Sequence, residues 1–166
     1  MRRFEDKERK IAWVRYEKAK EKECQKAIAE MNSWSDNPGI KRFIVEGMEC
    51  GKFFAESYAS LKNPAFMDYP GFKEPDKLNS FLYFLYDLND SQNFFGATIL
   101  NLEEDELDIE YLVINPSFQN KGIGARVLTS LKENMKALSE DEKPKIVTAM
   151  VDKENSPSIK LFSRIL

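Results

Sequence analysis

The chain has 166 residues, with 25 Lys and Arg against 28 Asp and Glu, and therefore a formal net charge of −3. Hydrophobic residues make up 42% of it, which suits the core of one ordinary domain and is too much for a disordered chain. Histidine is absent and there are two cysteines. This composition excludes Ser-His-Asp and Cys-His catalysis, His-containing zinc sites, Cys-only metal cages and disulfide frameworks.

The N-terminus carries no targeting signal that the sequence reveals. No apolar run follows Arg2-Arg3, and no segment approaches the roughly 18–20 apolar residues of a membrane span. We therefore expect a cytoplasmic protein without membrane association, with Cys24 and Cys50 as reduced, buried thiols.

Residues 3–34 contain neither Gly nor Pro. Their apolar positions recur close to a helical spacing, which predicts one long helix or two joined helices, ended by the turn residues 35–39. We expect a helical extension over residues 1–36, docked on a second domain over residues 37–166 or on another copy in a homodimer. The apolar positions are Phe4, Ile11, Val14, Cys24, Ala27, Ile28, Met31 and Trp34.

Residues 1–27 carry ten Lys and Arg against six Asp and Glu. A basic arm could bind nucleic acid. Because the acids are interleaved with the bases, the pattern favours an exposed helix with i,i+4 ion pairs over a nucleic-acid partner.

The remaining elements alternate in type along the chain. Turn residues at 89–91 and 103–106 separate three strand-like segments and predict an antiparallel meander, and a strand–helix–strand crossover follows it. The order indicates an α+β or α/β fold. The predicted elements are a short strand over 40–45, a helix over 48–61, strands over 80–87, 93–102 and 107–114, a helix over 121–138, a strand over 145–151 and a helix over 156–165.

The segment with the clearest chemical meaning is the turn from the strand 107–114 into the helix 121–138. Asn115-Pro116 ends the strand, and Gly122-Ile123-Gly124 opens the helix. The first helical turn has unpaired N–H groups that attract an anion, and glycine lets a phosphate approach the backbone. Lys121 and Arg126 could add positive charge. The alternative is an ordinary turn whose glycines serve packing.

Two other phosphate motifs do not fit. A dinucleotide-binding fingerprint needs a third glycine where Val127 stands. A Walker loop needs a longer spacing and a hydroxyl residue, whereas Gly47 and Gly51 are close together and Phe53 follows Lys52.

With its flanks, this turn resembles the GNAT superfamily of N-acetyltransferases. The resemblance covers residues 80–166 and rests on three linked features. They are the strand end Leu112-Val113-Ile114-Asn115-Pro116, the loop Gln119-Asn120-Lys121-Gly122-Ile123-Gly124, and the helix start Asn155-Ser156-Pro157-Ser158-Ile159-Lys160-Leu161-Phe162.

The resemblance implies a mixed, mostly antiparallel sheet flanked by helices. It also implies acetyl-CoA as co-substrate, no metal, and direct attack of a primary amine, from a small molecule or a peptide, on the thioester in a ternary complex. The backbone of Val113 and Ile114 would pair with pantetheine, and a backbone N–H within the stretch from Leu112 to Ile114 would polarise the thioester carbonyl. The loop Gln119, Asn120, Lys121, Gly122, Ile123, Gly124, Ala125 and Arg126 would hold the pyrophosphate, with Asn155 and Ser158 beside pantetheine and Tyr69 as a substrate contact.

A protonated amine must lose a proton before it attacks, and two carboxylates are candidates for the base. Strand alternation predicts that Asp108, Glu110, Leu112 and Ile114 share one face. Asp108 stands where many members of the superfamily carry a glutamate base, and Glu110 lies nearer the thioester. Both could equally be ordinary solvent-facing strand residues.

Two departures from the family pattern leave a second function open. Phe162 replaces the tyrosine that usually protonates the departing thiolate, and the chain stops at Leu166, where the family continues into two further strands. The alternative is a GNAT-like module that binds acyl-CoA as a sensor or scaffold without turnover.

Overall fold

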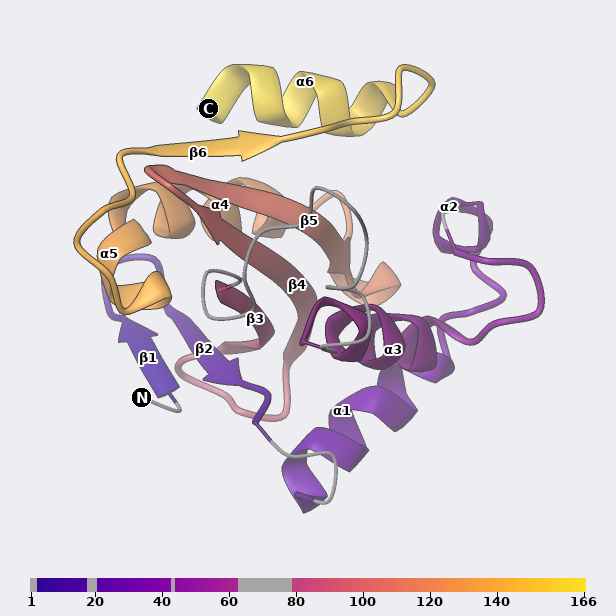
Figure 1. Cartoon of the computed structure of the whole chain (residues 1–166). Coiled ribbons are helices and arrows are strands. Elements are labelled where there is room, and N and C mark those ends of the chain that lie inside the picture. Colours follow the sequence, from indigo (N-terminus) through magenta and orange to yellow (C-terminus); the bar gives the residue numbers. More distant parts are fainter. Residues whose placement is uncertain (1–2, 18–20, 43, 63–78) are drawn as a thin grey trace.

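The computed structural model describes residues 3–17, 21–42, 44–62 and 79–166. Their centre is a six-stranded sheet with the strands in sequence order (Figure 1). Neighbours from β1 to β5 pair antiparallel, and β6 pairs parallel to β5. The strands are β1 (Arg3–Asp6), β2 (Ile11–Arg15), β3 (Asn79–Asp87), β4 (Phe94–Glu103), β5 (Glu106–Ile114) and β6 (Ile146–Ala149).

Helices cover both faces of the sheet (Figure 1). One face carries α1 (Lys22–Asn32) and α3 (Cys50–Lys62), with the short α2 (Pro38–Lys41) between them in the chain. The other face carries α4 (Ile123–Glu133), α5 (Met135–Ser139) and α6 (Ser156–Ile165). None of the helices in the described part of the chain is long and apolar enough to cross a membrane.

Both faces of the central strand β3 are buried. Tyr83 and Leu85 pack with α4 and α5, whereas Leu82 and Phe84 pack with α1 and α3. This two-sided burial explains why the sequence of β3 is apolar at nearly every position instead of alternating. The predicted meander, the helix over 48–61, the strand over 145–151 and the helix over 156–165 are confirmed within a few residues.

The predicted helix over residues 3–34 is wrong in its first half. Residues 3–15 form the β1–β2 hairpin, and a helix begins only at Lys22. Ile11 and Trp13 face α4, whereas Val14 faces α1, so side chains alternate between the two faces as in a strand. Because both faces are buried, the apolar residues of this segment do not show that alternation. The turn uses Lys10 at φ +60°, so neither Gly nor Pro marks it. The hairpin belongs to the central sheet.

Two smaller predictions also need correction. Residues 38–41 form α2 where a strand over 40–45 was expected, because Asn37 accepts a hydrogen bond from the Gly39 N–H and Pro38 occupies the first helical turn. The single helix over 121–138 is interrupted at Asn134, whose φ is −123°.

Candidate functional site

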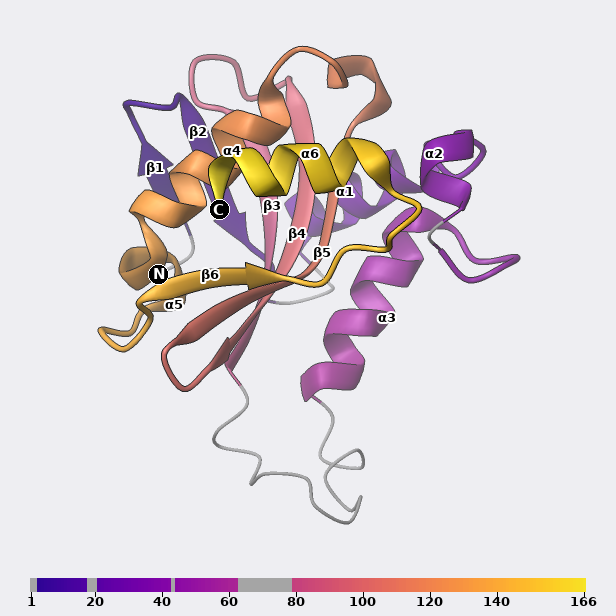
Figure 2. The same ribbon diagram turned by 90° about the horizontal axis from the view of Figure 1, so that it is seen from above.

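The edge of β5 that faces β6 is open along its second half. β6 pairs with β5 only from Glu106 to Ile109, and then diverges from it (Figure 2). The Asn115 N–H donates to the Phe95 carbonyl at 2.7 Å. By antiparallel alternation, the backbone groups of Leu112 and Ile114 point away from β4, toward this open edge. No other strand among the described segments pairs there.

A β-bulge at Glu110 changes which side chains share a face. Ile99 is opposite Tyr111 and Leu100 is opposite Ile109, so Glu110 has no opposite residue. Leu112 and Ile114 pack in the core beneath α4 and α6. They therefore do not share a face with Asp108 and Glu110, contrary to the prediction from regular alternation.

The two carboxylates face the α3 side of the sheet, and each is hydrogen-bonded to a neighbouring side chain. Asn101 alternates with the buried Leu100, which places it on that side, and its Nδ2 donates to Glu110 Oε2 at 3.0 Å. Thr148 of β6 donates to Asp108 Oδ1 at 2.9 Å. Ser80 donates to Asn101 Oδ1 at 2.5 Å. These bonds hold one oxygen of each carboxylate in place.

Glu110 has a perturbed acidity. Partial desolvation by its neighbours raises its pKa, the negative charge of Asp108 raises it further, and the hydrogen bond from Asn101 opposes both effects. A raised carboxyl pKa makes Glu110 a candidate proton acceptor.

Sequence reasoning missed Asn101 and Thr148 as the partners that fix the carboxylates. Asn101 lies directly opposite Asp108 in the β4–β5 hairpin. Pairing the predicted strands 93–102 and 107–114 outward from the turn between them would have placed Asn101 beside Asp108. Thr148 could not be found in this way, because β6 reaches β5 only after the α4–α5 crossover.

The turn after β5 is held by side-chain to backbone hydrogen bonds. Buried Asn115 donates to the Phe94 carbonyl at 2.9 Å and accepts from the Ser117 N–H at 3.0 Å. A 3-10 turn over Pro116–Phe118 follows. Gln119 Nε2 then donates back to the Ile114 carbonyl at 3.1 Å, which joins the loop to the end of the strand.

The start of α4 presents free backbone donors. Asn120 and Gly122 adopt positive φ values of 62° and 77°, and α4 begins at Ile123 without a side-chain cap. The first helical bond runs from the Arg126 N–H to the Gly122 carbonyl at 3.1 Å. The N–H groups of residues 123–125 therefore have no acceptor within the helix. We call these three groups the anion cradle.

The two glycines of the loop have different roles. A Cβ on Gly122 would meet nothing within 4 Å, so its requirement is the left-handed backbone conformation. A Cβ on Gly124 would lie 2.9 Å from Leu161 Cδ2 of α6. The absent side chain at position 124 thus allows α4 and α6 to approach closely.

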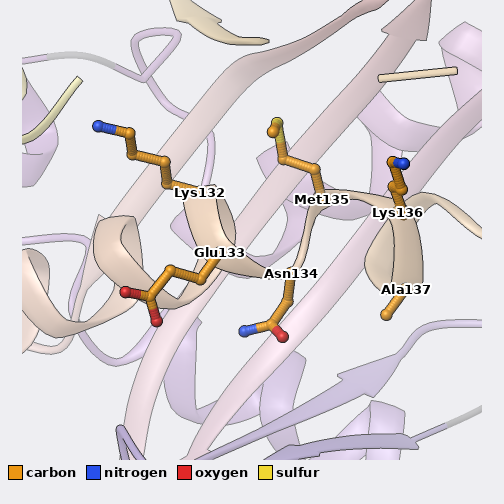
Figure 3. A pocket seen from close by; sticks show the side chains of 6 residues that line it. All are labelled: Lys132, Glu133, Asn134, Met135, Lys136 and Ala137. Atoms are coloured by element: carbon orange, nitrogen blue, oxygen red, sulfur yellow. The ribbon is translucent and has the colours of Figure 1, made fainter. Parts of the chain in front are cut away.

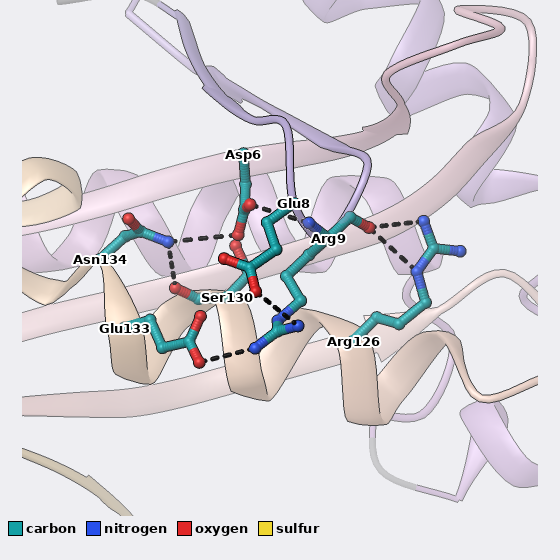
Figure 4. Close-up of polar contacts among 7 residues, drawn as sticks. All are labelled: Asp6, Glu8, Arg9, Arg126, Ser130, Glu133 and Asn134. Carbon is teal, nitrogen blue, oxygen red and sulfur yellow. Dashed lines mark hydrogen bonds and ion pairs between the residues drawn. The ribbon is translucent and has the colours of Figure 1, made fainter.

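The charged side chains of the loop are both held by neighbours. Lys121 Nζ lies 5.6 Å from the centre of the Phe118 ring. The Arg126 guanidinium points to the β1–β2 turn, where it donates to the carbonyls of Arg9 and Lys10 (Figure 4).

The second predicted helix start is formed as expected, and one predicted contact falls elsewhere. Asn155 caps α6 by accepting a hydrogen bond from the Ser158 N–H at 3.3 Å. Phe162 is half-buried against the core beneath α4. Tyr69, the predicted substrate contact, lies outside the described residues.

A shallow depression lies at the break between α4 and α5, with a volume of about 310 Å³, lined by residues 132–137 (Figure 3). It is at the opposite end of α4 from Gly122, roughly 15 Å away for an 11-residue helix. The open edge of β5, its two carboxylates and the anion cradle therefore make up the candidate site.

Residues 49–166 match the model of the acetyltransferase (GNAT) family. A comparison with curated protein sequences finds no match. Among solved structures, the spermidine N-acetyltransferase of Vibrio cholerae in complex with CoA and spermine has a TM-score of 0.59 at 13% identity, covering 94% of this chain and 79% of that one. The ribosomal-protein-S18-alanine N-acetyltransferase of Escherichia coli has a TM-score of 0.53 at 12% identity, covering 93% and 75%.

At these identities the structural matches establish the fold alone. The family match extends over more than half of the chain and includes the open strand edge, the loop and the anion cradle. The chain belongs to the GNAT acetyltransferase family, whose members usually transfer an acetyl group from acetyl-CoA to amine acceptors.

Proposed function

We propose that the protein is an N-acetyltransferase that moves the acetyl group of acetyl-CoA to a primary amine by direct attack in a ternary complex. One observation carries this proposal. The open edge of β5 leads through a single turn to the anion cradle at the start of α4. One stretch of backbone therefore offers hydrogen-bond partners for an extended chain and then N–H donors for a phosphate.

Coenzyme A fits these residues. The space around Gly122 is open, and the three free N–H groups of residues 123–125 suit a diphosphate at a helix N-terminus. The backbone of Leu112 and Ile114 would pair with the pantetheine arm, and a backbone N–H of this stretch would donate to the carbonyl oxygen of the acetyl group. Asn155 and Ser158, at the start of α6, would line the same arm. Bound acetyl-CoA supplies an acetyl group activated as a thioester.

Glu110 is the proposed proton acceptor. An aliphatic amine has a pKa of about 10 and is protonated at pH 7, so a base must take its proton directly or through a water molecule. The bulge aims Glu110 to the same side as Tyr111, and Asn101 fixes one of its oxygens. Asp108 is the second candidate, and as a neighbouring charge it tunes the pKa of Glu110.

One observation favours a second candidate function, a module that binds acyl-CoA without turnover. Phe162 cannot donate a proton to the departing thiolate, and its ring packs on the core. In the catalytic proposal, solvent or the exposed Ser163 supplies that proton.

Calorimetry with acetyl-CoA, followed by a thiol-release assay on polyamines, aminoglycosides, amino acids and peptides with free N-termini, separates these proposals. Binding and release of CoA with at least one amine class is the result expected of the enzyme. Binding without release on any amine supports the module, and no binding of acetyl-CoA would overturn both.

Gly122 allows a direct test of the anion cradle. A side chain at this position meets open space but strains the left-handed backbone, and Gly122→Glu should place a carboxylate where the diphosphate binds and abolish CoA binding. Gly122→Gln is the matched control, since glutamine has the same size and carries the same backbone strain without the charge. Equal CoA affinity of the two variants would contradict this placement of the phosphates.

A further inference from the structure

The first turn of α4 is attached to a part of the chain more than 100 residues away. Arg126 donates to the Arg9 carbonyl from Nε at 3.1 Å and from Nη2 at 2.7 Å (Figure 4). Its Nη2 also donates to the Lys10 carbonyl at 3.2 Å. Lys10 holds a positive φ of 60°, a left-handed conformation that residues other than glycine rarely adopt. Such a backbone persists where its surroundings determine it, and Arg126 is part of those surroundings.

Arg126 also reaches the loop before α4 through two aromatic rings. Its guanidinium lies 5.4 Å from the centre of the Phe95 ring, and Phe95 meets Phe118 edge to face at 5.2 Å. The ammonium of Lys121 lies 5.6 Å from the Phe118 ring. This row of cation, ring, ring and cation links the hairpin, β4 and the loop over residues 116–121.

The position of this arginine is costly by itself. A cation in the first turn of a helix faces the positive end of the helix dipole. Hydrogen bonds to the two hairpin carbonyls offset this unfavourable interaction with the helix dipole. They also occupy the guanidinium N–H groups that could otherwise bind a phosphate. The guanidinium is thus directed away from the anion cradle, while the backbone N–H of Arg126 closes the first helical turn.

We propose that Arg126 is a positioning residue for coenzyme A. It acts through the backbone, because it holds the first turn of α4 and the loop before it in place. In that geometry the N–H groups of residues 123–125 point together toward the diphosphate. This inference rests on the proposed function. Backbone donors contribute to binding only while their geometry is fixed, and helix ends fray unless they are held.

Arg126→Met is the informative variant, because it keeps the length and the apolar stem but removes the charge and the donors. We expect a Kd for CoA about fivefold higher, which corresponds to the loss of a helix-terminus interaction of about 1 kcal/mol. The KM for acetyl-CoA should rise by a similar factor, with a smaller change in kcat. Arg126→Lys retains a cationic donor and should recover most of the affinity.

The hairpin provides a matched control at the other end of α4. Arg9 Nη2 lies 2.6 Å from Glu133 Oε1 there (Figure 4). Glu133→Gln weakens this second attachment of the same hairpin while leaving the first turn of α4 intact. It should leave the Kd for CoA within about twofold of the wild type, and amide hydrogen exchange at residues 126–128, the first hydrogen-bonded amides of α4, should accelerate only in the Arg126 variant.

The outcomes are distinguishable. A wild-type protein that binds no CoA would overturn the proposed function and this inference with it. A wild type that binds CoA, with R126M and E133Q alike in affinity and in amide exchange, would overturn the inference alone. Should R126M not fold, Arg126→Gln takes its place in the comparison with E133Q. Its side chain keeps a hydrogen-bond donor but is too short to reach both carbonyls.

Discussion

A Cβ at position 124 would lie 2.9 Å from Leu161 Cδ2, closer than real Cβ contacts allow. The crossover helix α4 and the following helix α6 therefore pack against each other at a position where glycine leaves room for this leucine methyl.

Enlarging Gly124 should separate the two helices. We expect Gly124→Leu to lower the free energy of unfolding by about 1–3 kcal/mol through overpacking, as measured by urea denaturation. Leu161→Ala in the same chain should restore part of the loss, with a coupling energy of at least about 0.5 kcal/mol in a double-mutant cycle. Additive effects of the two substitutions would mean that this contact does not limit the packing.

The pH dependence of turnover should follow Glu110. A proton acceptor must be ionised, so kcat/KM should fall as the pH drops through a pKa above the ordinary glutamate value of about 4.3. Removing the neighbouring negative charge in Asp108→Asn should lower the pKa of Glu110 and move this acidic limb to lower pH. Glu110→Gln should reduce kcat strongly at unchanged affinity for acetyl-CoA.

The shift between the wild type and Asp108→Asn is the decisive measurement, because ionisation of the amine substrate affects both profiles equally. Thr148→Val serves as a control that loosens Asp108 without removing its charge. An acidic limb that stays at the same pH in Asp108→Asn would exclude Glu110 as the base.

The hairpin should be essential for folding. Trp13 is fully buried, and its Nε1 donates to Ser130 Oγ of α4 at 3.0 Å. Ser130→Ala leaves the buried indole N–H without an acceptor and should cost about 1–3 kcal/mol of unfolding free energy, whereas Trp13→Phe combined with Ser130→Ala removes the unsatisfied donor. A cost near zero for Ser130→Ala, measured by chemical denaturation, would show that the hairpin is loosely attached.

The two thiols should report opening of the α1–α3 side. Burial raises the pKa of Cys24 and of Cys50 to about 11, so both remain protonated at neutral pH. Neither should react with a thiol reagent in the folded protein, and both should react in denaturant, monitored spectroscopically. Fast labelling of either cysteine under native conditions would contradict the burial of that helix.

The C-terminal half could be predicted from sequence because its signals are local. The turn residues after β3 and after β4, and the loop over 119–124, each determine their own backbone, so the meander and the cradle were placed to within a few residues. Asn115 shows why: it fixes the turn through its own neighbours in the chain.

The N-terminal hairpin could not be predicted, because its stability comes from distant partners. β2 forms a strand by pairing with β3, and Lys10 turns the chain in a conformation that arginine-to-carbonyl bonds from α4 support. The bulge at Glu110 was missed for a related reason. A single unpaired residue reverses every later side chain, and the sequence of β5 contains neither Gly nor Pro to mark it.

The pairing of β2 with β3 has a consequence for how the chain is made. The hairpin is synthesised before its sheet partner β3, which follows roughly 70 residues later. Until then Ile11 and Trp13 have neither β3 nor α4 to cover them. We expect this long-range closure to be the slow step of folding, and the nascent N-terminal segment to be the part of the chain most exposed to chaperones and to aggregation.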